Sequence, residues 1–192
     1  MNNQYINNLI KMLDCIEIWH GTDQKCLDYD EGINRLVDIF SGHKERKSQL
    51  FFIGNGGSSA IASHMTADFM KNGGMNTYSL YDNAVTTCMG NDYGYEYIFS
   101  RPIEFLVREG DLLVAISSSG NSQNIINAID TACVRGASII TFTGFEPDNK
   151  VKQMGEINVY VPCRKYGIVE SIHNLILQHI VDVIMERDGV KF

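Results

Sequence analysis

The sequence lacks several features that define large classes of protein. Its five cysteines are widely spaced and include no Cys-x-x-Cys pair, which argues against a zinc ribbon or disulfide framework and favours reduced thiols. It has no excess of basic residues, and the net charge of −7 argues against general binding to nucleic acid or to an anionic membrane. No apolar run approaches transmembrane length, and the polar N-terminus does not resemble a signal peptide. We therefore expect a cytoplasmic protein.

The N-terminal part of the sequence has a helical pattern. Apolar residues recur at helical spacing over residues 3–19 and 29–43, and residues 21–25 are typical of a turn. Two helices before any strand have apolar faces that need a cover, which a partner subunit could supply. The expectation is a single domain over residues 1–192. In it, residues 1–45 form a helical oligomerisation segment and residues 46–192 an α/β core.

From residue 49 the pattern alternates between short apolar runs and helical segments. The predicted strands cover residues 49–53, 77–81, 111–116, 138–143 and 157–162, and a long helix is predicted over 167–187. Strands separated by helices pair in parallel with right-handed crossovers. The expected fold is therefore a three-layer, doubly wound α/β domain with a five-stranded parallel sheet. Ligands of such folds bind at the carboxyl ends of the strands.

Two turns rich in small polar residues follow predicted strands. Residues 54–59 (Gly-Asn-Gly-Gly-Ser-Ser) follow the first strand, and residues 117–122 (Ser-Ser-Ser-Gly-Asn-Ser) follow the third. Each precedes a helix, so each presents backbone N–H groups suited to an anion; a serine-rich helix cap without a ligand is the alternative. Neither turn fits Gly-x-Gly-x-x-Gly or a P-loop, which disfavours a nucleotide cofactor. A compact phosphate monoester suits them better.

These turns, together with further stretches of the chain, resemble the sugar isomerase (SIS) domain family, and within it the phosphoheptose isomerases. The supporting stretches are residues 52–58, 90–94, 98–101, 108–111, 116–122 and 141–144. The resemblance covers nearly the whole chain. It implies a flavodoxin-like fold and a homotetramer whose active sites lie between subunits.

The resemblance also implies residues that bind a sugar phosphate. The serine turn would hold the phosphate, chiefly through the hydroxyls of Ser117, Ser119 and Ser122. Asn55 and Ser58 would help to hold the sugar, and Asp92 falls on a family position near the sugar hydroxyls. The full set of implied substrate-binding residues is Asn55, Gly56, Ser58, Asp92, Ser117, Ser118, Ser119 and Ser122. For Asn55 and Asp92, the alternative is an ordinary turn residue.

The sequence departs from the family at the acid/base positions. His64 and Asp68 occupy the positions of a histidine and a glutamate on one helix face, so the carboxylate is kept but shortened. In the last helix, Glu170 and Gln178 stand where the family has a glutamine and a histidine. His179 is rotated about 100° from Gln178 and does not replace the lost imidazole.

Two interpretations of these positions stay open. The resemblance implies a divalent-metal site, with zinc held by His64, Asp68, Glu170 and Gln178. Alternatively Asp68 and Glu170 act as an acid/base pair whose pKa values are driven apart, with Gln178 as a third catalytic residue. An exposed helical pair with no function is the other possibility for His64 and Asp68.

The resemblance implies an aldose–ketose isomerase acting on a sugar phosphate. The expected substrate is sedoheptulose 7-phosphate, converted to D-glycero-D-manno-heptose 7-phosphate for a lipopolysaccharide or capsule. The alternatives are isomerisation of another sugar phosphate, or a non-catalytic SIS protein that binds a sugar phosphate or another protein, as in a family member that binds the replication initiator DnaA. We expect no nucleic-acid or membrane partner.

Overall fold

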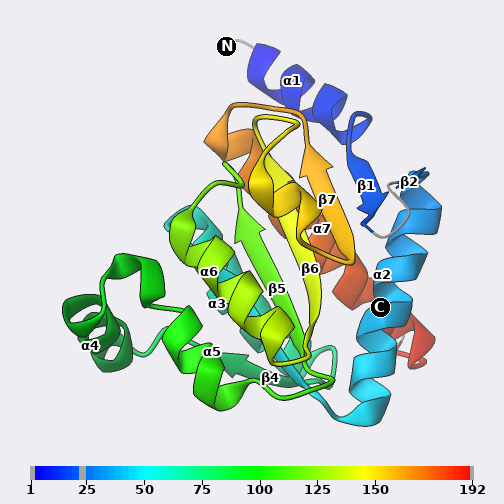
Figure 1. Cartoon of the computed structure of the whole chain (residues 1–192). Coiled ribbons are helices and arrows are strands. Elements are labelled where there is room, and N and C mark those ends of the chain that lie inside the picture. The colour runs from blue at the N-terminus through cyan, green and yellow to red at the C-terminus, as the bar shows by residue number, and fades with distance from the viewer. Residues whose placement is uncertain (1–2, 22–24, 191–192) are drawn as a thin grey trace.

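The computed structural model describes residues 3–21 and 25–190 and forms one sheet with helices on both faces (Figure 1). Five strands are parallel: β3 (Gln49–Gly54), β4 (Asn76–Ser79), β5 (Leu112–Ser117), β6 (Ser138–Gly144) and β7 (Ile157–Val161). They lie in the order β4-β3-β5-β6-β7. This is the flavodoxin-like order, whose switch point lies between β3 and β5. The predicted doubly wound parallel core is confirmed.

The number of strands was predicted wrongly. Two further strands, β1 (Glu17–His20) and β2 (Lys25–Leu27), extend the sheet antiparallel beyond β7, so the sheet has seven strands and is mixed. Ile16 fitted a helical stripe, but the first helix, α1 (Gln4–Leu13), ends before it. The pairing of β1 with β7 is a contact between distant segments, so local spacing does not show it. Of the predicted turn over 21–25, residues 22–24 lie outside the described residues.

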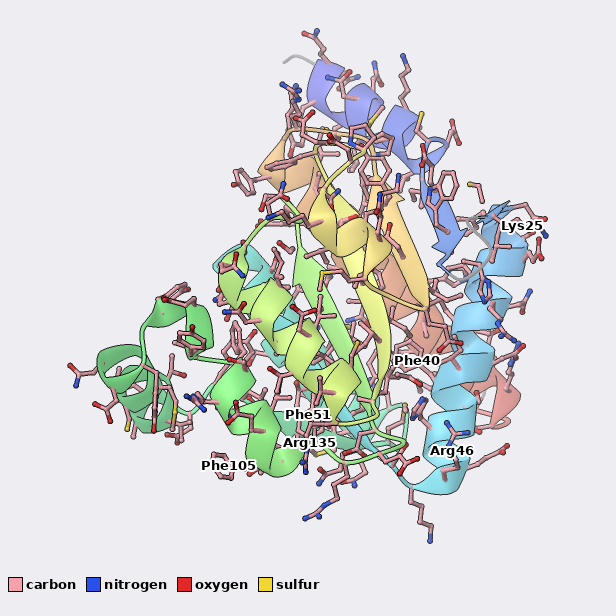
Figure 2. The ribbon with its side chains drawn as sticks, in the orientation of Figure 1. Lys25, Phe40, Arg46, Phe51, Phe105 and Arg135 are labelled. Atoms are coloured by element: carbon pink, nitrogen blue, oxygen red, sulfur yellow. The ribbon has the colours of Figure 1, made fainter. Side chains whose placement is uncertain are left out.

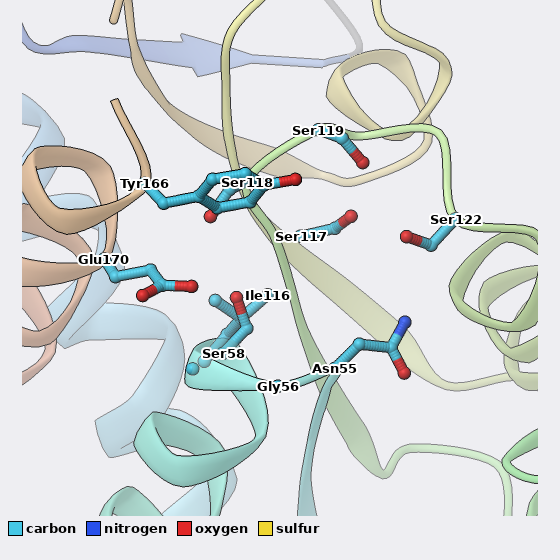
Figure 3. Close-up of a pocket in the computed structure, with 11 residues that line it drawn as sticks. Asn55, Gly56, Ser58, Ile116, Ser117, Ser118, Ser119, Ser122, Tyr166 and Glu170 are labelled. Atoms are coloured by element: carbon cyan, nitrogen blue, oxygen red, sulfur yellow. The ribbon is translucent and has the colours of Figure 1, made fainter. Parts of the chain in front are cut away.

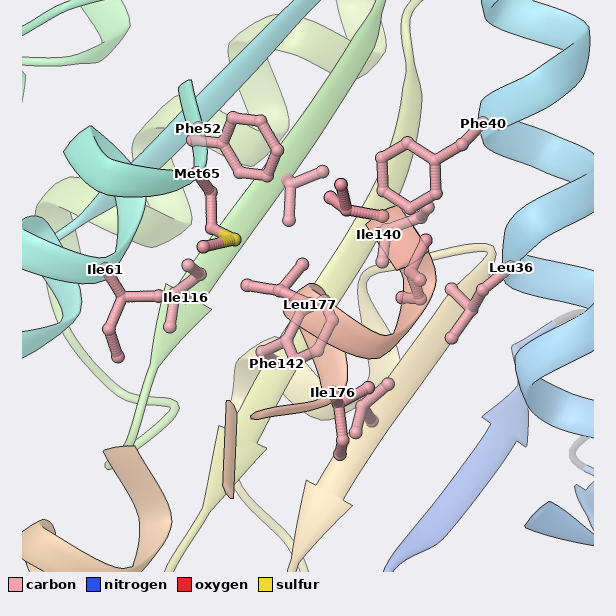
Figure 4. Packing of buried hydrophobic residues seen from close by; sticks show 14 of the residues in the cluster. Leu36, Phe40, Phe52, Ile61, Met65, Ile116, Ile140, Phe142, Ile176 and Leu177 are labelled. Atoms are coloured by element: carbon pink, nitrogen blue, oxygen red, sulfur yellow. The ribbon is translucent and has the colours of Figure 1, made fainter. Parts of the chain in front are cut away.

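The helices form two layers on the sheet. Helices α2 (Tyr29–Arg46), α3 (Gly57–Lys71) and α7 (Tyr166–Arg187) cover one face, and α5 (Ser100–Leu106) and α6 (Gln123–Val134) cover the other. Strand alternation divides the core: Leu50 and Phe52 face the first layer, and Phe51 and Ile53 face the second. Figure 4 shows the first cluster, where α7 packs on the sheet between α3 and α2.

The apolar face of α2 is covered within the chain. Its residues Ile33, Leu36, Val37 and Phe40 are buried in the core, so for this helix the chain itself supplies the cover that a partner subunit could have supplied. Helix α1 differs, because none of its residues is buried. Tyr5, Ile6 and Ile10 of α1 are about half exposed. The N-terminal segment thus contributes to the domain itself, through α2 and through the two extra strands.

An arm extends from the second layer. It contains α4 (Asn83–Asp92), none of whose residues is buried, and the 3-10 helix η1 (Tyr95–Tyr97) (Figure 1). Helix α5 follows η1, and Pro102 lies in the first turn of α5, where a proline is tolerated. Phe105 of α5 points outward and is 76% exposed, whereas Phe40 and Phe51 turn inward (Figure 2). A second 3-10 helix, η2 (Lys150–Gln153), precedes β7.

Helix α7 is a core helix. Among the described residues it is the one helix that could cross a membrane by length and composition alone, but half of that stretch is buried inside the protein. His173 in its middle is fully buried and donates from Nε2 to the carbonyl oxygen of Thr143 at 3.0 Å. Burial lowers the pKa of His173 to about 4. The ring is thus a neutral core residue.

This buried ring makes stability depend on pH. The pKa of His173 is lower in the folded protein than its ordinary value of 6.5, so the unfolded chain binds more protons between the two values. We expect the free energy of unfolding to fall as pH drops from 6.5 to 4, by about 3 kcal/mol from this group. Denaturant titrations at pH 7 and pH 4.5 measure it. His173→Gln should flatten the dependence, and equal slopes in both proteins would contradict the assignment.

Candidate active site

The two polar turns meet at the switch point of the sheet. Strands β3 and β5 are hydrogen-bonded neighbours, with Gly54 opposite Ile116, so both turns leave the same edge. A pocket of about 370 Å³ opens there (Figure 3). Its lining comes from the two turns and from the first part of α7: Asn55, Gly56, Gly57, Ser58, Ile116, Ser117, Ser118, Ser119, Ser122, Tyr166 and Glu170. Two segments 60 or so residues apart thus form one concave site, as the pattern of turns predicted.

One end of the pocket is built from hydroxyl groups. The side chains of Ser117, Ser119 and Ser122 point into a common space (Figure 3). Ser118 is buried, and its Oγ has no hydrogen-bond partner among the described residues. Within residues 3–21 and 25–190, no lysine, arginine or histidine lines the pocket. An anion held here would therefore be bound by neutral donors and by the N-terminal ends of α3 and α6.

The serine turn is held in shape by the loop before β7. Gly120 has a positive φ of 62°, and a Cβ there would lie 1.8 Å from Oδ1 of Asn149, so glycine is required on both counts. The Gly120 carbonyl accepts from the backbone N–H of Val151 at 3.0 Å. Asn149 is itself buried and caps η2. The hydroxyls are therefore presented by a fixed backbone.

Glu170 lies at the other end of the pocket, on the α7 side (Figure 3). A Cβ at Gly57 would lie 2.3 Å from Glu170 Oε2, so the carboxylate rests against the bare backbone where α3 begins. Partial burial raises the pKa of Glu170. Tyr166, one helical turn before Glu170, also lines the pocket. The site thus pairs an anion-binding end with a carboxyl group suited to proton transfer.

The other predicted acid/base residues form a separate cluster. Gln178 Nε2 donates to Asp68 Oδ2 at 2.7 Å, and His64 Nε2 lies 3.1 Å from each partner. None of the three lines the pocket. Gln178 is eight residues beyond Glu170, which places it about 12 Å further along α7. The structure therefore brings together His64, Asp68 and Gln178, but it separates Glu170 from them.

This cluster fits a small cation in its donor chemistry. One Nε2 atom of His64 cannot both donate to Asp68 and accept from Gln178, so the contacts of the triangle are not all satisfied. An imidazole, a carboxylate and an amide oxygen are acceptable ligands for a divalent metal. Among residues 3–21 and 25–190, however, no group of three or more His, Cys, Asp and Glu side chains is arranged to hold a metal ion. Three of the four predicted ligands are together, and Glu170 is not one of them.

Asp92 is the one predicted substrate-binding residue that the structure places elsewhere. It ends α4 on the arm, is exposed, and accepts from Cys88 Sγ at 3.4 Å. His179 stacks on Tyr29 of α2, away from the pocket lining. Arg101 forms an ion pair with Glu104 at 3.0 Å.

Sequence reasoning missed several residues that shape the pocket. The Tyr81 hydroxyl donates to the Gly54 carbonyl at 3.0 Å and accepts from the Gly54 N–H at 2.7 Å, which fixes the end of β3. Asn124 and Tyr95 hold the side chain of Asn55. Tyr166 lines the pocket itself. No local pattern marks these four residues, because each acts through a contact with a distant segment.

Comparisons with known proteins agree with this geometry. The family model described as SIS domain matches residues 24–144. The chain belongs to the SIS domain family. This SIS protein is 35% identical over 162 residues to a phosphoheptose isomerase from Akkermansia muciniphila, covering 81% of this chain and 85% of that one.

Solved structures show the same relationship. A phosphoheptose isomerase from Neisseria gonorrhoeae has a TM-score of 0.81 at 27% identity, covering 94% of this SIS protein and 95% of the other chain. One from Francisella tularensis has a TM-score of 0.83 at 25% identity, covering 96% of each chain. The resemblance inferred from the motifs is confirmed.

The contact between Gly57 and Glu170 is testable. Gly57→Ala places a methyl group where the carboxylate lies, and we expect the flexible side chain of Glu170 to move out toward solvent. Its pKa should then fall toward the ordinary value of 4.5, because less burial opposes ionisation. Carbon-detected NMR titration of the Glu170 carboxyl measures this shift. Gly90→Ala in α4, where a Cβ meets only ordinary contact, is the control and should leave the titration unchanged.

Proposed function

We propose that this protein is an aldose–ketose isomerase acting on a sugar phosphate, with sedoheptulose 7-phosphate as its substrate and a heptose 7-phosphate as its product. The observation that carries the proposal is the division of one pocket into a hydroxyl-lined end and a carboxyl end. Such a pocket can anchor a phosphate at one end while the other end of the sugar chain meets Glu170. The relatives named phosphoheptose isomerase support the choice of substrate.

In this proposal Glu170 moves the proton. Isomerisation transfers a proton between two adjacent carbons through a cis-enediol, and one carboxyl group can remove it from one carbon and return it to the next on the same face. A raised pKa suits this role, because the group must both accept and release a proton near neutral pH. The Tyr166 hydroxyl lines the same pocket and is available to the sugar oxygens. Asp68 and Gln178 do not line the pocket, so their catalytic role stays a prediction.

The deuterium content of the product tests the proposal. In deuterated water, the purified protein should convert sedoheptulose 7-phosphate to an aldose that carries deuterium at C2. NMR and mass spectrometry of the product measure this deuterium. Glu170→Gln should lower the rate by at least about a hundredfold, as expected for loss of a general acid/base. It should leave phosphate affinity nearly unchanged, because the serine end is intact.

Two results would count against it. Full activity of Glu170→Gln would remove Glu170 from the mechanism. Tight binding of the sugar phosphate without exchange at any carbon would favour the alternative function, a non-catalytic SIS protein. That alternative is supported by the pocket lining, which contains only one of the predicted acid/base residues, Glu170.

A divalent metal is a second part of the proposal. His64, Asp68 and the amide oxygen of Gln178 would hold it, and a bound cation there would link α3 to α7 outside the pocket. We expect zinc to raise the thermal midpoint of the purified protein by several degrees, since a ligand that binds the folded state stabilises it. His64→Ala and Asp68→Asn should each abolish the shift. Glu170→Gln is the matched control and should keep it; loss of the shift there would return Glu170 to the metal set.

Assembly and location complete the proposal. We propose a homotetramer, because α1 and α4 have no buried residues within the chain and short helices are marginal in water without packing partners. A cytoplasmic location is consistent with the five cysteines, all of which lie in the described part of the chain and are free thiols. The proposed role is to supply a heptose phosphate for a surface polysaccharide.

A further inference from the structure

Asn55 in the pocket is held by a pair of reciprocal hydrogen bonds. Its Nδ2 donates to Asn124 Oδ1 at 2.9 Å, and Asn124 Nδ2 donates back to Asn55 Oδ1 at 2.8 Å. A third bond comes from the arm, where the Tyr95 hydroxyl donates to the same Asn55 Oδ1 at 3.0 Å. Asn124 lies in the first turn of α6 and is buried. Three bonds from two distant segments therefore fix one amide group at the edge of the pocket.

These bonds decide which atom of the amide faces the ligand. Both lone pairs of Asn55 Oδ1 are used by Asn124 and Tyr95, whereas one of the two Nδ2 hydrogens has no partner among the described residues. Figure 3 shows the amide nitrogen on the side of Ser117 and Ser122, with the oxygen turned away. The pocket therefore meets Asn55 as a hydrogen-bond donor, next to the serine hydroxyls.

The amide pair alone would not determine this orientation. If Asn55 and Asn124 both flipped, they would form the same two bonds with nitrogen and oxygen exchanged, and the Asn55 oxygen would face the pocket. Tyr95 breaks this equivalence, because a phenol donates hydrogen bonds better than it accepts them and its partner is then the oxygen. Tyr95 is itself placed by α6, since Asn127 Nδ2 donates to the carbonyl of Glu96 at 2.9 Å. The helix that follows the serine turn thus also positions the residue that orients Asn55.

We infer that Tyr95 and Asn124 are positioning residues that hold Asn55 as a donor, so that the pocket selects a ligand group with acceptor oxygens next to the serine turn. The identity of that ligand, a sugar phosphate, rests on the proposed function. The orientation of Asn55 does not depend on the proposed function, because it is a property of the protein alone.

The test compares two neighbouring tyrosines. Tyr95→Phe removes the hydroxyl that donates to Asn55, and Tyr97→Phe is the matched control, because the Tyr97 hydroxyl has no partner among the described residues. Tyr95→Phe should weaken the binding of inorganic phosphate or sedoheptulose 7-phosphate about fivefold in calorimetry, the effect of one hydrogen bond. The Tyr95→Phe variant should raise KM by about the same factor and should keep kcat within about twofold of the wild-type value. The reason is that the hydrogen bond stabilises the bound substrate and the transition state alike. Tyr97→Phe should match the wild type.

Two further variants test the polarity and the second partner. Asn55→Asp replaces the donor that faces the pocket by an anionic acceptor, so binding should fall more than about tenfold. Wild-type affinity in Asn55→Asp would show that the oxygen faces the ligand and would overturn the inference. Asn124→Ala should weaken binding at least as much as Tyr95→Phe, with its thermal midpoint measured to confirm folding.

A ligand-free measurement separates this inference from the proposed function. The side-chain amide signals of Asn55, assigned by their loss in Asn55→Asp, should shift in Tyr95→Phe and stay in place in Tyr97→Phe in nitrogen–proton NMR spectra. Unchanged Asn55 signals in Tyr95→Phe would refute the positioning role even if the enzyme is an isomerase. Shifted signals in a protein that binds no sugar phosphate would support the positioning role while the proposed function fails.

Discussion

The parallel pairing of β3 with β5 is the constraint on which the rest of the site depends. Because Gly54 lies opposite Ile116, the two polar turns leave the sheet side by side, and the helices that follow them begin at the same edge. The positive ends of both helices therefore point toward one small volume. The two turns can lie this close together because they consist largely of the small residues glycine, serine and asparagine. The close packing of Gly120 against Asn149 also fixes the backbone of the serine turn.

The electrostatics of the pocket follow from this arrangement. A phosphate there would meet hydroxyls, backbone N–H groups and one oriented amide, but no lysine, arginine or histidine side chain of the described residues lines the pocket. A cation would bind the phosphate more strongly, yet it would also form an ion pair with Glu170 and lower the pKa of that carboxyl group. Neutral donors avoid this conflict, since they leave the pKa of Glu170 governed by its burial. Anion binding and proton transfer can thus occupy one pocket.

The packing of α3 beside α7 explains why the predicted polar residues fall into two places. Both helices begin at the edge that carries the pocket and run away from it, so their first turns reach the ligand and later turns do not. Gly57 and Glu170 meet in the first turns, whereas Asp68 and Gln178 meet two or more turns later. Spacing along each helix predicted that His64 and Asp68 share a face, but the distance of that pair from the pocket depends on where each helix starts.

The sequence by itself determined the parallel core, the two turns at one edge and the family, because strand-helix alternation and glycine-serine turns are local patterns. It did not determine the antiparallel extension by β1 and β2, since Ile16 fits a helical stripe and the pairing of Ile18 with Val159 of β7 is a contact that local spacing does not show. It also did not reveal Tyr166, which lines the pocket, or three residues that form hydrogen bonds across 27 to 69 residues of chain: Tyr81, Tyr95 and Asn124. Such contacts exist only after folding, so only the tertiary structure decided which atom of Asn55 faces the pocket and which predicted residues reach it.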